Sequence, residues 1–165
     1  MIWLRLVHIL SGIFWVGSTL FMAVFLLPAA RRAGAEGRRF AGQVMQRLGP
    51  VLGITMLLTL ASGFALYARV SGGFQRVWVT SGPGRAYGVG AVAALLAVVI
   101  GFTVNGRTNI KLAALRKRLE ATGAAPSTAE AALLEQGQTR IARGAWVVAG
   151  LLLIAAAAMA TARYL

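Results

Sequence analysis

Four long apolar runs constrain this chain more than any other feature of its sequence. They cover approximately residues 2–30, 49–68, 86–105 and 144–162. A helix needs about 20 mainly apolar residues to cross a bilayer, and each run reaches that length. Backbone groups in lipid must be bonded within their own segment, which favours helices. The sequence therefore predicts an all-α single domain over 1–165, an integral membrane four-helix bundle with antiparallel, up-and-down order.

The first run lies where a signal peptide would lie, but its length argues against one. It continues well past the usual h-region of about 7–15 residues and has no clear small-x-small cleavage site after a short core. We expect it to be retained as the first transmembrane helix.

The polar connections also carry helical patterns. Residues 31–47 are predicted to become helical before the second run. Residues 107–143 begin as an extension of the third helix, with Ile110, Leu112, Leu115 and Leu119 along one side. Ser127 and Glu130 then form a capping box that starts the fourth helix. We expect the third and fourth helices to extend beyond the bilayer as a cytoplasmic hairpin.

The basic residues predict an orientation. Most lie in the first and third connections: Arg31, Arg32, Arg38, Arg39, Arg47, Arg107, Lys111, Arg116, Lys117, Arg118, Arg140 and Arg143. The other side of the predicted membrane carries Arg5, Arg69, Arg76, Arg85 and Arg163. The positive-inside rule places both termini outside, in a multi-pass protein of the inner (plasma) membrane. The net charge of +13 favours anionic headgroups over nucleic acid as a partner, because the charges flank apolar runs.

Composition excludes several kinds of active site. The chain has no cysteine, so it cannot build a zinc–thiolate site or use a thiol nucleophile. Its only carboxylates are Glu36, Glu120, Glu130 and Glu135. All four lie in polar stretches, which disfavours a carboxylate pair or a magnesium or calcium cage. No catalytic constellation is visible.

A polar stripe runs along the first helix. His8, Ser11, Trp15, Ser18 and Met22 follow one another at spacings of three and four residues, which places them on one face. Lipid cannot satisfy these polar groups, so we expect the face to point into the bundle. Trp15, like Trp146, could stack on a cofactor or serve as core.

The single histidine, His8, allows three interpretations. It could be an interfacial residue that bonds a neighbour or headgroups. It could be an axial ligand of haem b, with Met, water or His8 of another subunit as the second ligand. It could also bind copper together with Met22, Met56 or Met159, because thioethers suit Cu(I).

Small and weakly polar positions in the other helices predict helix contacts. Gly49 and Gly53 form a GxxxG motif, which Thr55, Thr59, Ser62 and Gly63 follow. Gly101, Thr103 and Asn105 close the third run. Trp3, Trp78 and Tyr164 lie near helix ends and fit an aromatic belt.

Several short pieces resemble one family. The first helix, with His8, Trp15, Gly17 and Pro28 before basic residues, resembles the opening helix of the copper resistance protein D (CopD)-like family and related HemJ-type four-helix membrane proteins. Thr80 to Arg85, TSGPGR, is similar to the turn that enters the third helix of the copper family, and the Asn105-Gly106-Arg107 exit is loosely similar. The resemblance implies a four-helix membrane bundle linked to haem or copper, with His8 as the matching haem-associated histidine.

One departure bears on activity. Both relatives usually carry a lysine just inside the third helix, and this chain has AYGVGAVAALLAV there. In HemJ-type protoporphyrinogen oxidases that lysine is associated with activity, so the resemblance does not imply the oxidase reaction.

Three functions follow as hypotheses. The first is a redox or metal-handling protein that binds haem b or copper through His8, with Ser11 and Trp15 beside the cofactor. The second is a non-catalytic membrane scaffold or accessory subunit of a larger complex, as a homodimer or with other proteins. The third is a small transporter, for which intramembrane charges are missing.

Overall fold

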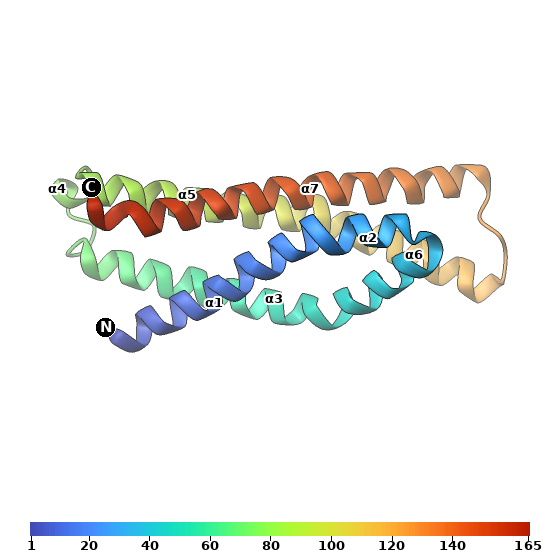
Figure 1. Cartoon of the computed structure of the whole chain (residues 1–165), viewed down its shortest axis with the longest axis horizontal. Coiled ribbons are helices and arrows are strands. Elements are labelled where there is room, and N and C mark those ends of the chain that lie inside the picture. The colour runs from blue at the N-terminus through green and yellow to red at the C-terminus, as the bar shows by residue number, and fades with distance from the viewer.

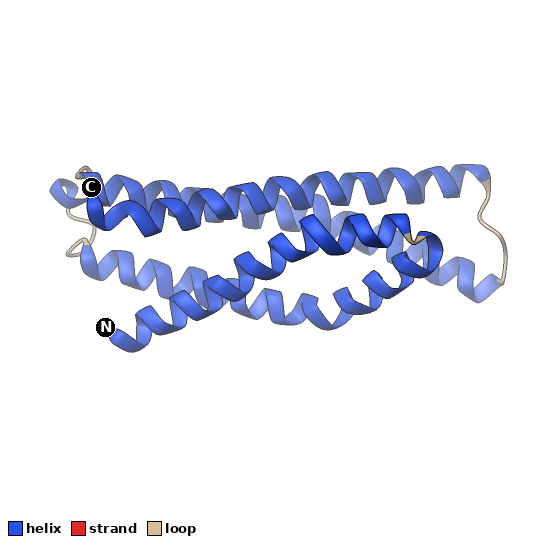
Figure 2. Cartoon of the chain, viewed as in Figure 1, coloured by secondary structure: helices blue, strands red, loops and turns tan.

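The computed structural model describes residues 1–165, which are helical almost throughout, with no strand (Figure 2). The prediction of an all-α chain is confirmed. In chain order the elements are α1 (Ile2–Phe21), the π-helix η1 (Met22–Leu26), α2 (Leu27–Arg32), α3 (Gly34–Val70), α4 (Arg76–Val79), α5 (Gly82–Ile100), the π-helix η2 (Gly101–Gly106), α6 (Arg107–Thr122), α7 (Thr128–Thr161) and the 3-10 turn η3 (Ala162–Tyr164).

Four long helices account for the four apolar runs. They are Ile2–Arg32, Gly34–Val70, Gly82–Thr122 and Thr128–Tyr164, and each is long and apolar enough to cross a membrane. Both chain termini lie at one end of the molecule, which we call the terminal end (Figure 1). The turn between α2 and α3 and the loop between α6 and α7 lie at the other end. We call it the basic end, since most arginines and lysines lie in its connections.

The helical connections at the basic end match the sequence patterns. α3 begins at Gly34, so most of the basic segment 31–47 belongs to the second long helix. Gly123 ends α6 in the left-handed conformation, with φ +62°, and the Ser127–Glu130 capping box begins α7. Arg118 pairs with Glu130 across this loop.

One side of α6 differs from its prediction. Leu112 is buried, and a Cβ on Gly137 of α7 would approach its side chain to 2.8 Å. Ile110 is 72% exposed, so the prediction that it lies along the same side of the helix as Leu112 is wrong. Residues two positions apart on a helix are separated by about 200° around its axis. Since Leu112 faces α7, Ile110 points away from it.

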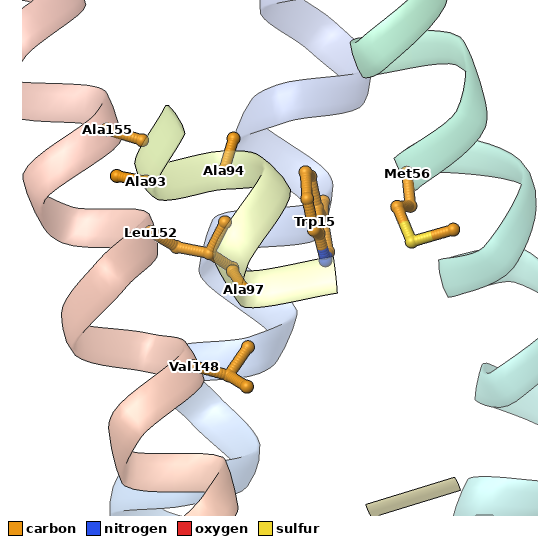
Figure 3. Packing of buried hydrophobic residues seen from close by; sticks show 8 residues of the cluster. All are labelled: Trp15, Met56, Ala93, Ala94, Ala97, Val148, Leu152 and Ala155. Atoms are coloured by element: carbon orange, nitrogen blue, oxygen red, sulfur yellow. The ribbon is translucent and has the colours of Figure 1, made fainter. Parts of the chain in front are cut away.

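The core is built from small side chains at the contact between α5 and α7. Ala93, Ala94 and Ala97 of α5 pack against Leu152 and Ala155 of α7. α1 adds the indole of Trp15, which Figure 3 shows between the α5 alanines and Met56 of α3. Alanines let the two helix backbones approach closely, as in other membrane bundles.

The GxxxG motif does not lie in this contact. A Cβ added to Gly49 or Gly53 would meet nothing within 4 Å, so the prediction that they bring helices of this chain together is wrong. They lie on a face of α3 that no other helix covers. The close approach occurs instead at Gly90 of α5, where a Cβ would lie 3.1 Å from the Ala155 carbonyl oxygen.

Two π turns interrupt the long helices. In η1 the N–H of Leu27 bonds to the carbonyl of Met22, one residue beyond the usual partner. Pro28 follows at once; it has no N–H and crowds the carbonyl four residues before it, which explains the wider turn. In η2 the Arg107 N–H bonds to Phe102. Both π-helices contact α7.

The alanine contact yields a stability prediction. Ala97 is 1% exposed, so Ala97→Leu should overpack the α5–α7 contact and lower the free energy of unfolding by about 1–3 kcal/mol. Val99→Leu, on an exposed position of the same helix, is the control. Thermal unfolding in detergent, followed by tryptophan fluorescence, measures both; equal melting temperatures would contradict this packing.

Candidate functional site

His8 lies against α3 near the terminal end, and its ring is oriented by hydrogen bonds. Its Nδ1 is 2.9 Å from the carbonyl oxygen of Thr59 and 3.3 Å from the hydroxyl oxygen of Ser62. A carbonyl can only accept, so Nδ1 of the neutral ring carries the proton and donates it. The lone pair of the ring is then on Nε2, to which no group of this chain donates.

Gly63 provides the space for the ring. A Cβ at this position would lie 2.7 Å from Cε1 and 3.1 Å from Nδ1 of His8. Any larger residue would push the imidazole from its place. The backbone of α3 therefore fits the ring by shape as well as by the hydrogen bond from Nδ1.

Ser11 and Thr59 extend the polar contact by one helical turn. The Thr59 hydroxyl lies 2.9 Å from the Ser11 hydroxyl oxygen, and both side chains are buried. Ser11 donates to the carbonyl of Val7, so the single hydroxyl proton of Thr59 is donated either to Ser11 or to the carbonyl of Thr55. This arrangement satisfies the hydroxyl groups inside an apolar contact and fixes α1 against α3.

The remaining stripe residues lie on the predicted inner face but have other neighbours. Trp15 is 6% exposed and belongs to the core, so its ring is not open beside His8. Ser18 is half-buried. Met22 is buried in η1, fourteen residues from His8, which is about 21 Å along a helix. The structure does not bring His8 and Met22 together around one ion.

The other aromatic residues singled out in the sequence are Trp146 and the three predicted belt residues. Trp146 is 54% exposed, so the suggestion that it serves as core is wrong, and its ring lies on the outer face of the bundle. Trp3 and Tyr164 are exposed near the terminal end, as a belt requires. Trp78 is half-buried: it stacks on Tyr87, with ring centroids 6.2 Å apart, and meets Tyr67 edge-on.

Sequence reasoning named Thr59, Ser62 and Gly63 only as small or weakly polar positions. The structure makes them the surroundings of His8. These residues follow one another at spacings of three and one, which places them on one face of α3. That shared face was the only signal in the sequence. Nothing in the sequence indicated that it contacts His8. The structure contains no group of three or more histidine, cysteine or acidic side chains placed to hold a metal ion.

The sequence did not predict a second polar region, which the structure forms from distant segments. At the basic end, a cavity of about 250 Å³ lies between the helices, and Arg31, Arg38, Arg116 and Asn105 contribute to its wall. It does not reach His8.

No protein-family model, curated protein or solved structure matches this chain.

Gly63→Ala tests the geometry at His8. The added methyl should displace the ring and break the Nδ1 contact to Thr59, whereas Gly53→Ala, in open space on the same helix, should leave it intact. Because His8 is the only histidine, a ¹⁵N spectrum of labelled histidine reports this ring alone. We expect Nδ1-protonated imidazole in the parent and in Gly53→Ala, and a mixed tautomer signal in Gly63→Ala. A parent ring protonated on Nε2 would contradict the assignment.

Proposed function

We propose that this protein is an integral membrane protein that binds haem b through Nε2 of His8 and serves in redox or metal handling. Copper bound at the same nitrogen is the alternative. A bound haem would supply one-electron chemistry. The chain itself orients the ring, holds the proton on Nδ1 and packs apolar helices beside the site.

The hydrogen bond from His8 Nδ1 to the Thr59 carbonyl carries this proposal. Histidines that ligate metals almost always donate their other ring nitrogen to a carbonyl, a carboxylate or water, which fixes the ring and makes the ligating nitrogen more basic. His8 has this partner at 2.9 Å, and Ser62 lies beside it. The residues present therefore fit the first ligand of such a centre.

The donors near His8 favour haem over copper. A porphyrin already supplies four nitrogens, so one histidine suffices to hold the iron. A copper ion needs several protein ligands, and thioethers are the soft ligands this chain could offer. Met22 lines the cavity at the basic end, Met56 packs in the core, and Met159 packs near Gly90. Any further ligand of the iron would be water or His8 of a second copy.

The arrangement in the membrane is also a proposal. Four antiparallel helices cross the inner (plasma) membrane, with both termini outside and α6 and the start of α7 as a cytoplasmic hairpin. The distribution of arginine and lysine supports this orientation, and the location of both termini at one end agrees with their lying on the same side of the membrane. The basic end would then meet anionic headgroups of the inner leaflet.

A visible spectrum tests haem binding. The protein, expressed with ample haem supply and purified in detergent, should show a Soret band that sharpens and shifts when dithionite is added. His8→Ala should lose this band because the iron loses its nitrogen ligand. Met22→Leu should keep it, since Met22 lies far from the ring.

Other outcomes discriminate between the functions. A Soret band retained in His8→Ala would rule out His8 as the ligand. A colourless protein that binds copper in a His8-dependent manner supports the copper alternative. A protein with neither, which co-purifies with other membrane proteins, would support the scaffold or accessory-subunit hypothesis.

Single cysteines test the orientation. The chain has none of its own, so Ala125→Cys in the loop between α6 and α7 and Gln75→Cys near α4 each give one thiol. In intact cells, a membrane-impermeant maleimide should label Cys at position 75 and should reach position 125 only after permeabilisation. The reverse pattern would overturn the orientation.

A further inference from the structure

The cavity at the basic end is open to a cationic mouth and closed by an apolar floor. Its volume is about 250 Å³, somewhat below the range of about 300–1,000 Å³ typical of pockets for drug-sized ligands. Its floor includes Met22, Leu52 and Val148, from three of the long helices. Its polar lining is Thr19, Arg31, Arg38, Asn105, Asn109, Arg116 and Gln138.

Three positive charges face this cavity without a carboxylate. Arg31, Arg38 and Arg116 come from α2, α3 and α6, and none of the four glutamates lines the wall. Arg31 donates to the Gln138 carbonyl at 2.7 Å, which anchors its guanidinium at the wall and leaves its other N–H donors free. Three like charges at one cavity repel one another, and an anion between them would relieve that repulsion.

Asn105 offers a further donor. Its Oδ1 is the only buried side-chain nitrogen or oxygen without a hydrogen-bond partner, and it lies against Gly144 of α7. A Cβ on Gly144 would lie 3.3 Å from Nδ2 and nearer still to Oδ1, so the whole amide lies against α7. An unpaired buried acceptor is unfavourable, so Asn105 is held in this place at a cost in stability.

Both π turns border the same cavity. Met22 belongs to η1 and Asn105 to η2, and both residues line it. π turns are costly local irregularities that occur frequently at functional sites, because they redirect side chains that a regular helix would place elsewhere. The presence of both π turns at one cavity is a separate observation from the charges of its arginines.

We propose that this cavity is a binding site for a phosphate group. Arginine recognises phosphate oxygens through paired, charge-assisted hydrogen bonds, and the amides of Asn105, Asn109 and Gln138 add neutral donors. The cationic mouth with an apolar floor suits a phosphate carried on an amphiphile. A phospholipid headgroup and a free phosphate or phosphate ester share this chemistry. The proposal does not depend on His8 or on any cofactor there.

Charge-matched double variants test the site. Arg38→Gln/Arg116→Gln removes two cavity arginines, and Arg39→Gln/Lys117→Gln removes two neighbouring exposed charges outside the cavity. The detergent-purified protein is titrated with inorganic phosphate at constant ionic strength, and separately with phosphatidylglycerol against phosphatidylcholine. The melting temperature, followed by tryptophan fluorescence, reports binding because a ligand that binds the folded state raises it.

We expect the parent and the outer double variant to be stabilised alike. The cavity double variant should need at least about tenfold more ligand for the same shift, since it lacks two charge-assisted contacts. Stabilisation by inorganic phosphate alone would identify free phosphate or its esters as the source. Stabilisation by phosphatidylglycerol alone would identify the lipid headgroup. Equal responses of the two double variants, or no response of the parent to either probe, would overturn the proposal.

A steric variant keeps the test decisive if the charge variant does not fold. Gly42 lines the cavity and a Cβ there meets nothing within 4 Å, so Gly42→Leu should fill the cavity without removing a charge. Gly53→Leu, in open space on the same helix, is its control. Loss of ligand stabilisation in Gly42→Leu but not in Gly53→Leu supports the site, and an unchanged response in Gly42→Leu contradicts it.

Discussion

The close approach of helix backbones through alanine and glycine is the contact on which the rest of this bundle depends. α5 and α7 meet along Ala93, Ala94, Ala97 and Ala155, and the two backbones also come close at Gly90. In lipid there is little hydrophobic gain from burying large apolar side chains, so helices associate through packing at small residues and through hydrogen bonds. The same principle explains why so many large apolar residues remain on the outside.

The polar groups inside the apolar helices follow from that constraint. Each must find a partner within the bundle, because lipid provides none. Near the terminal end, His8, Ser11, Thr59 and Ser62 satisfy one another and the local carbonyls. At the basic end, the arginines and Asn105 surround a cavity instead, and Oδ1 of Asn105 has no partner. The two ends therefore differ: at the terminal end Nδ1 of His8 and the hydroxyl groups have partners within the chain and only Nε2 of His8 has none, whereas at the basic end several polar side chains face a cavity.

Periodicity and end signals were sufficient for much of the fold. The four runs became four long helices, and the Ser127–Glu130 capping box was readable because it is local. The surroundings of His8 were not readable, since the pairing of α1 with α3 depends on which helix faces are complementary. GxxxG at Gly49 was misleading because the motif describes one helix surface and does not identify its partner. The arginine cavity joins residues from four segments, and no local pattern records such a convergence.

The two π turns change the rotational phase of the helices that contain them. A π turn contains one residue more than an α turn, so everything beyond it is rotated by about 100° relative to an uninterrupted helix. The helical face that begins at His8 can therefore be followed only as far as Met22, and a helical wheel drawn through Pro28 assigns the wrong face to Arg31. In distant relatives, a one-residue deletion within η1 (22–26) or η2 (101–106) would convert the π turn to an α turn. It would rotate the rest of the helix and would not shorten a loop. Alignments that score such a gap as neutral would miss the change in which side chains meet.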